Sequence, residues 1–213
     1  YNISRSGIFP REPKITEEDW SKIQEYFLQK APAEIPPSPK KPEAIEDLAL
    51  FSSKSVHVPQ LKGGMSCFIR FDSLTKSIWV GDGRNMLVEA DVNGMVKNSQ
   101  QTPSPVVDAI FRETGNHHWL TIGSILPSDR QQGVFWATDS TNYFEPQIEN
   151  LARPVQITPA DLNQDGEEDV IVSNFGNFTG NLSWYEKKRD GSYEAHLLSA
   201  NPGASGTRIV DMN

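Results

Sequence analysis

The sequence predicts an all-β fold: a β-propeller fragment of about three four-stranded blades, preceded by a short N-terminal α-helix. Short runs rich in Val, Ile, Phe and Trp alternate with turn dipeptides such as Asn93-Gly94 and Asp190-Gly191. Related segments recur about 50 residues apart, which is the length of one four-stranded blade. An acidic loop over residues 161–169 enters one of the expected strands.

The composition excludes several classes of function. The chain has 213 residues and a formal net charge of −8, and no cluster of Lys and Arg outweighs the acidic residues, so nucleic acid is not an expected partner. No apolar run approaches the roughly 20 residues that span a bilayer, so no transmembrane segment is expected. Cys67 stands alone, cannot form an internal disulfide, and is expected to be a small buried residue in a strand.

Residues 1–31 are predicted to form a helical N-terminal segment, with a helix over residues 16–30. Thr16 can cap this helix, and three acidic residues follow it in the first turn, where the helix dipole favours negative charge. Trp20, Ile23 and Phe27 fall on one face of the helix. Pro32 is expected to end it.

Residues 32–45 are predicted to be a proline-rich linker, because closely spaced prolines cannot lie inside a sheet. Residues 46–213 are predicted to form the propeller blades. Within them, strands are expected over residues 68–71, 77–80, 119–122, 133–136, 169–172 and 182–185. Four of these strands carry a tryptophan, for which packing between blades is favoured over a sugar-stacking platform. The tryptophans are Trp79, Trp119, Trp136 and Trp184.

The clearest repeat pairs Asp161-Leu162-Asn163 with Asp211-Met212-Asn213, about 50 residues further on. Weaker echoes occur at Asp72 and Asp108, which lack a following ladder of carboxylates and therefore predict metal-free blades. The Asp211 segment matches the opening of a second loop and stops before its glycine. The chain is therefore expected to be a piece of a longer protein, with a propeller of about seven blades.

Residues 161–169 have the pattern of a calcium loop. Oxygen-bearing side chains occupy positions 1, 3, 5 and 9, and alternate residues of a tight loop can direct their oxygens at one point. Gly166 permits the sharp turn. An EF-hand is excluded because its position 12 must be Glu and is Val172 here. A plain hairpin with an Asp-Gly turn stays open as the alternative.

The acidic loop, the following Asn174-Phe175-Gly176 and the segment 180–186 resemble the FG-GAP/VCBS repeat family, whose propeller is also that of the integrin α-subunit head. The resemblance covers roughly residues 154–213. It implies a calcium ion held between strands of a blade. Its implied ligands are the side chains of Asp161, Asn163, Asp165 and Asp169, with Glu167 contributing through its backbone.

The N-terminal residues 8–32 resemble the last helix of the c-type cytochrome domain that some of these repeat proteins carry. No haem attachment motif is present, so no haem is expected in this chain.

The expected function is therefore that of a calcium-binding, extracytoplasmic propeller that acts as a non-catalytic binding or scaffold module for a protein or polysaccharide ligand. Calcium loops of this kind need the millimolar ion of the extracellular or periplasmic space. The alternative is a propeller domain of a secreted carbohydrate-active or redox-linked enzyme. His117 and His118 follow a turn and are expected to be solvated.

Overall fold

The structure is a computed structural model, and it describes residues 16–32, 34, 37, 55, 57–61, 65–126, 130–139, 141 and 143–210. The chain divides into two compact units, Tyr1–Val56 and His57–Asn213. Most of the predicted linker and the repeat at Asp211 lie outside the described residues, so these remain predictions.

The first unit contains helix α2 (Glu17–Lys30). Its N-terminus is closed by a capping box, in which the Thr16 hydroxyl accepts the Asp19 backbone N–H at 3.0 Å and the Asp19 carboxylate accepts the Thr16 backbone N–H at 3.4 Å. The predicted helix and its cap are confirmed. Among the described helices, none combines the length and the apolar character that crossing a bilayer requires.

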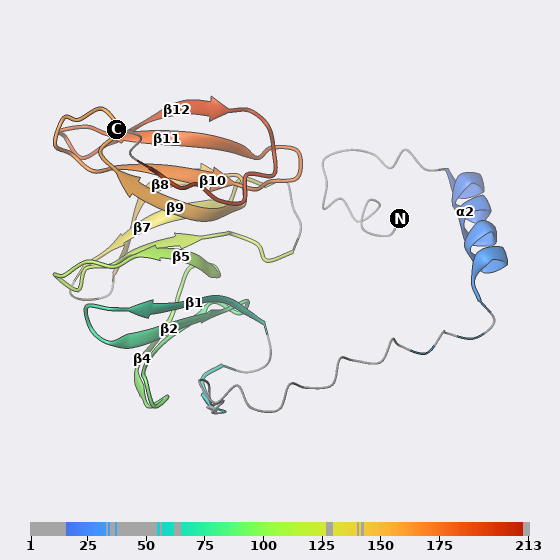
Figure 1. Cartoon of the computed structure of the whole chain (residues 1–213), viewed down its shortest axis with the longest axis horizontal. Helices are drawn as coiled ribbons and strands as arrows, with labels where there is room; N and C mark the ends of the chain where they lie inside the picture. Colours follow the sequence, from blue (N-terminus) through green and yellow to red (C-terminus); the bar gives the residue numbers. More distant parts are fainter. Residues whose placement is uncertain are drawn as a thin grey trace. The chain divides into compact units, whose positions relative to one another are not determined.

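The second unit contains three antiparallel sheets, each built from four strands that are consecutive in the sequence (Figure 1). The first sheet is β1 (Ser66–Asp72), β2 (Ser77–Asp82), β3 (Met86–Asp91) and β4 (Val96–Gln101). The second is β5 (Val106–Ile110), β6 (His118–Thr121), β7 (Gly133–Thr138) and β8 (Phe144–Leu151). The third is β9 (Pro154–Ala160), β10 (Asp169–Asn174), β11 (Asn181–Lys187) and β12 (Tyr193–Ser199).

The first strands of the three sheets lie next to one another. Strand β5 contacts β1 on one side and β9 on the other, whereas β4 and β12 lie at the outer edges (Figure 1). Consecutive four-stranded antiparallel sheets with adjacent first strands are the blades of a β-propeller. The predicted fold class is confirmed.

The hydrophobic core lies between the sheets. One cluster joins the first sheet to the second, and another joins the second to the third. Trp79 and Trp119 belong to the first cluster, with ring centroids 5.0 Å apart, so the expected packing role is confirmed for these two. Trp184 differs, since it is half-buried and stacks on the His196 ring with centroids 4.4 Å apart.

Five of the six expected strands fall within observed ones, and the sixth, 119–122, matches β6 except for Ile122, which follows the strand. The run Val170-Ile171-Val172 lies in β10, every residue of which is buried. Several turns between strands are closed by an aspartate. Asp91 accepts the backbone N–H groups of Asn93 and Met95, both at 2.8 Å. Gly94, between Asn93 and Met95 in this turn, has a φ of 85°, a backbone conformation that residues with a side chain rarely adopt.

Asp108, one of the weaker sequence echoes of Asp161, has a structural role of its own. It lies inside β5 and is buried. Its Oδ1 lies 2.7 Å from Nη1 of Arg70 in β1, and its Oδ2 accepts the Ile157 backbone N–H of β9 at 3.0 Å. Burial raises the pKa of this carboxyl group. Asp108 therefore joins the first strands of all three sheets through Arg70 and the Ile157 N–H.

The expectation of a solvated turn at His117 is wrong. The His117 ring is buried, and its centroid lies 5.1 Å from that of Phe111 and 5.8 Å from those of Trp79 and Trp119. Its Nδ1 accepts the backbone N–H of Arg112 at 3.2 Å. The ring completes the aromatic cluster between two sheets, and this long-range packing outweighs the local turn signal.

The Asp108 contacts predict a specific loss of stability. Asp108→Ala removes the acceptor of a buried N–H and the partner of Arg70, and we expect the free energy of unfolding to fall by about 2 kcal/mol. Urea titration followed by tryptophan fluorescence measures the change. Asp91→Ala is the control, because it removes an exposed turn acceptor within a single sheet. An equal effect of the two substitutions would contradict the role given to Asp108.

Candidate functional site

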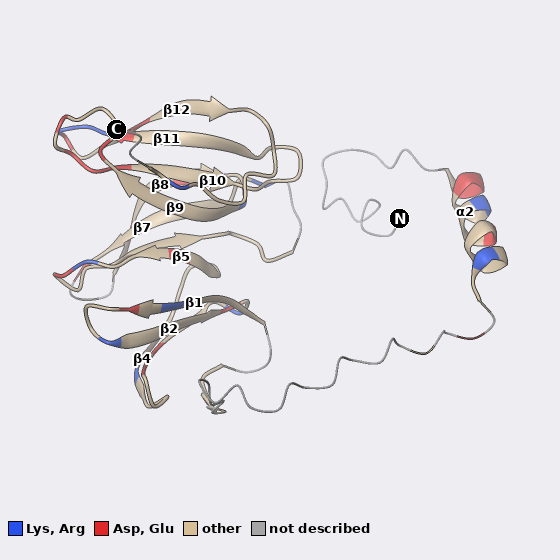
Figure 2. Ribbon diagram, viewed as in Figure 1, with Lys and Arg blue, Asp and Glu red and all other residues tan. Residues whose placement is uncertain are grey.

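The acidic loop lies between β9 and β10, at one end of the third sheet. Figure 2 shows acidic positions, in red, gathered in the loops at this end. Asp161, Asn163 and Asp165 are exposed, Glu167 is half-buried, and Asp169 is fully buried as the first residue of β10. The structure thus places all five predicted ligands in one connection between neighbouring strands.

The side chains at loop positions 1 and 3 are directed at the same atom. Oδ1 of Asp161 and Oδ1 of Asn163 both accept the backbone N–H of Asp165, at 3.2 and 3.1 Å. The second oxygen of Asp161 accepts the Gly166 N–H at 3.0 Å. The two side chains therefore face a common point inside the loop.

Asp165 continues this arrangement at position 5. Its Oδ1 accepts the backbone N–H of Glu167 at 2.8 Å, and its Oδ2 accepts the side-chain amide of Asn163 at 3.0 Å. These hydrogen bonds, the Glu167 one foremost, hold the pKa of the Asp165 carboxyl group below its usual value. The group is therefore kept as an anion.

Asp169 closes the loop from the sheet side. Its Oδ2 accepts the backbone N–H of Leu162 at 3.1 Å, and its Oδ1 accepts that of Lys187 in β11 at 2.9 Å. The first of these bonds links the two ends of the loop, and the second links the loop to the next strand. Glu167 lies at the side, with its Oε2 3.7 Å from Nζ of Lys187.

The donor set of the loop suits a hard divalent cation, which prefers carboxylate, amide and carbonyl oxygens. Each carboxylate oxygen has more than one acceptor direction, so a backbone N–H bond leaves capacity for an ion. The loop carboxylates Asp161, Asp165 and Asp169 do not themselves lie within 4.8 Å of one another as a group of three. The residues fit calcium by the type of their oxygen atoms.

Glu168, the residue before Asp169, connects the loop to the second sheet. Both carboxylate oxygens of Glu168 accept from the guanidinium of Arg112, which lies in the connection between β5 and β6. Such a two-pronged pair fixes direction as well as distance. The position of the loop therefore affects the contact between the second and third sheets.

His118 lies close to this contact. Its ring packs edge-on against Phe135, with centroids 5.4 Å apart, and the side chain is half-buried. Burial, together with the nearby positive charge of Arg112, lowers the pKa of His118 to about 4. The imidazole is therefore neutral near pH 7.

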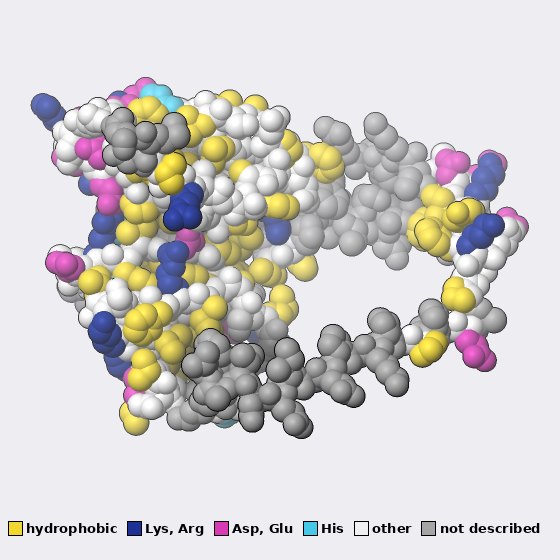
Figure 3. Space-filling view, in the orientation of Figure 1, with side chains coloured by type: hydrophobic (Ala, Val, Ile, Leu, Met, Phe, Trp, Pro, Cys, Tyr) yellow, Lys and Arg dark blue, Asp and Glu magenta, His cyan; other side chains and the backbone are white. Residues whose placement is uncertain are grey.

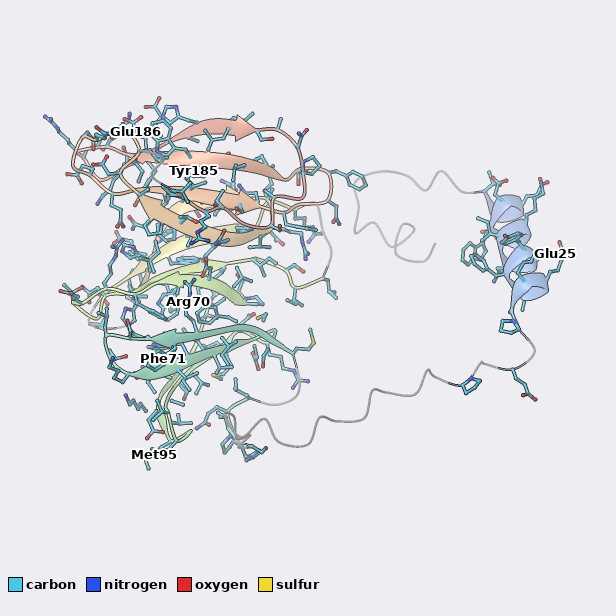
Figure 4. The ribbon with its side chains drawn as sticks, in the orientation of Figure 1. Glu25, Arg70, Phe71, Met95, Tyr185 and Glu186 are labelled. Carbon is cyan, nitrogen blue, oxygen red and sulfur yellow. The ribbon has the colours of Figure 1, made fainter. Side chains whose placement is uncertain are left out.

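Sequence reasoning missed a group formed by Glu186, Glu194 and His196, whose ligand atoms lie within 4.8 Å of one another. Glu186 and Glu194 face each other across β11 and β12, and Nζ of Lys188 lies 2.8 and 2.6 Å from them. This ammonium group offsets the repulsion between the carboxylates. Glu186, labelled in Figure 4, also accepts from the Asn163 amide at 3.2 Å, which ties the group to the loop.

The signal for this group is the spacing of Glu186 and Glu194 on either side of the hairpin turn at Asp190-Gly191. The pairing of these two side chains can be recognised only when the register of β11 and β12 is known, because a shift by one residue would place Glu186 and Glu194 on opposite faces of the sheet.

No family model matches the chain, and no curated protein matches it. A solved structure described as "Structure of Dos1 propeller" is similar over 64% of this chain and 37% of that chain, with 12% sequence identity and a TM-score of 0.46. This chain thus aligns with little more than a third of that chain's length.

The environment of His118 predicts a pH dependence of stability. Its pKa in the folded chain, about 4, lies below the ordinary value of 6.5, so the unfolded chain binds more protons between these values. The contribution of His118 is therefore fully present above pH 6.5 and is lost as pH falls toward 4. Urea titrations at pH 7, 6 and 5 should show falling stability, and His118→Gln should make the decline shallower. An unchanged slope in the variant would contradict this account.

Proposed function

We propose that this propeller is a binding module whose third blade is stiffened by a calcium ion in the loop over residues 161–169. The observation that carries the proposal is the convergence of Asp161 and Asn163 on the Asp165 N–H, at 3.2 and 3.1 Å. A hairpin turn needs one such acceptor, as at Asp91, whereas this loop directs two side chains at one point.

The ion would be held by the side chains of Asp161, Asn163, Asp165 and Asp169 and by the backbone carbonyl of Glu167. When bound, calcium supplies positive charge that offsets the repulsion of three carboxylates in one short loop. Binding to the folded chain alone then adds to its stability. A chain that uses calcium in this way belongs where the ion is millimolar, which is the extracellular or periplasmic space.

Two contacts of the loop would carry the rigidity of the calcium-bound loop to neighbouring strands. Asp169 holds the loop to β11 through the Lys187 N–H, and Glu168 holds it to the second sheet through Arg112. The loop therefore sets the position of one blade against its neighbour. A fixed blade arrangement is what a propeller needs in order to present a preformed surface to a protein or polysaccharide ligand.

Calcium is expected to raise the melting temperature of the chain. At a calcium concentration about 100 times the dissociation constant, the increase should be about 5–10 °C relative to chelator-treated protein. Asp165→Asn should abolish the increase, because it removes one charge while keeping an acceptor oxygen. Differential scanning fluorimetry with calcium, with magnesium and with EDTA measures the effect.

Asp91→Asn is the matched control, since it makes the same chemical change in a turn that has no converging side chains. It should leave the calcium response intact. Coincident melting curves in calcium and EDTA would defeat the proposal and leave the loop as a turn closed by its own N–H groups.

A further inference from the structure

A groove of about 600 Å³ runs along the first strands of the three sheets. Arg70 and Phe71 line it from β1, Phe111 from the end of β5, and Gln156 from β9. Arg208 and Ile209, which follow the last strand, form the remaining wall. Its volume lies within the range of about 300–1,000 Å³ that is typical of small-molecule sites.

The wall formed by residues 207–209 is held against the third sheet. The backbone N–H of Thr207 donates to the side-chain oxygen of Gln156. The Thr207 hydroxyl lies 3.3 Å from that of Thr158 and 3.4 Å from that of Ser173. The segment therefore runs beside β9, and its neighbour Arg208 has a defined place in the groove.

The groove is basic in a chain whose formal net charge is −8. The guanidinium of Arg70 is held by Asp108 and by the Ala109 carbonyl, so its charge is compensated and its position is fixed. In the part of the chain that the structure describes, no carboxylate pairs with Arg208, which is exposed. The groove thus has one uncompensated positive charge.

The remaining lining is largely apolar. The Phe71 side chain is 50% exposed and Ile209 is 42% exposed, so both present hydrophobic surface to an incoming molecule. Figure 3 shows basic side chains, in dark blue, set among hydrophobic ones, in yellow, over the middle of the sheet unit. Figure 4 labels Arg70 and Phe71, which follow one another in β1. Apolar walls with a few placed polar groups are the usual make-up of a ligand site.

We propose that this groove binds a small organic anion, whose carboxylate, sulfonate or phosphate group pairs with Arg208 and whose apolar or aromatic body lies against Phe71 and Ile209. Arginine suits this role because its planar guanidinium presents several N–H donors to an anionic group. The inference rests on the binding role proposed above and names the class of ligand. It does not depend on calcium, since no residue of the loop lines the groove.

The test uses the full chain and two dyes of the same shape, 8-anilinonaphthalene-1-sulfonate and its uncharged counterpart N-phenyl-1-naphthylamine. The anionic dye should bind saturably, with one site per chain, and more tightly than the uncharged dye. Arg208→Gln should weaken binding of the anionic dye about tenfold or more, the worth of one charged hydrogen-bonded contact, and leave the uncharged dye unaffected. Fluorescence titration gives both dissociation constants.

Arg84→Gln is the matched control, because Arg84 is an exposed arginine in the turn between β2 and β3, outside the groove. Arg70→Gln is avoided, since it breaks the buried contact with Asp108. Anionic-dye binding that is insensitive to Arg208→Gln, as binding on the exposed face of α2 would be, overturns the inference. Equal binding of both dyes also overturns it.

Each titration is paired with a melting curve in calcium and in EDTA. If calcium stabilises the chain but the dye binds without Arg208, the groove inference alone fails. If the dye needs Arg208 but calcium changes no melting curve, the calcium role alone fails and the groove inference is supported.

Discussion

The packing of the three blades depends on one buried carboxylate. Asp108 would carry a large desolvation cost if it were unpaired, since a buried charge needs partners that replace water. It receives them from both neighbours, Arg70 of the first sheet and the Ile157 N–H of the third. The hydrophobic clusters on either side supply attraction that has no preferred direction. The contacts of Asp108, in contrast, fix the position of β5 along β1 and along β9. The floor of the groove is built from the same three strands, so its shape follows from this contact.

The acidity of the chain has a structural origin that is separate from any metal. Aspartates close turns in all three sheets by accepting backbone N–H groups, at Asp82, Asp91, Asp139 and Asp190. Each does so through one oxygen within its own turn. The loop over residues 161–169 differs because two side chains converge on one N–H and because Asp169 is buried at its base. Convergence, rather than negative charge, is therefore what sets this loop apart from the ordinary aspartate turns of the chain.

Local patterns in the sequence predicted the local structure. The helix with its Thr16 cap, the strand at Val170 and the turns at Asn93-Gly94 and Asp190-Gly191 depend on residues close together in the chain. The missed features depend on distant residues. Asp108 meets Arg70 and Ile157 only once three sheets are packed, and Glu186 meets Glu194 only in one strand register. The groove combines four segments spread from residue 70 to residue 209, so no window of sequence contains it.

Strand β9 connects the two sites. At its end the chain enters the acidic loop through Asp161, and along its length Gln156 lines the groove and anchors the segment that carries Arg208. Asp169 ties the loop to β11, and Glu168 ties it to the second sheet. Because the loop continues β9, a movement of the loop would also move the end of that strand. A rigid loop therefore fixes the wall on which Arg208 is placed. If both proposals hold, an ion in the loop would make the groove more nearly preformed, and a preformed site loses less entropy when it binds, without any contact between ion and ligand.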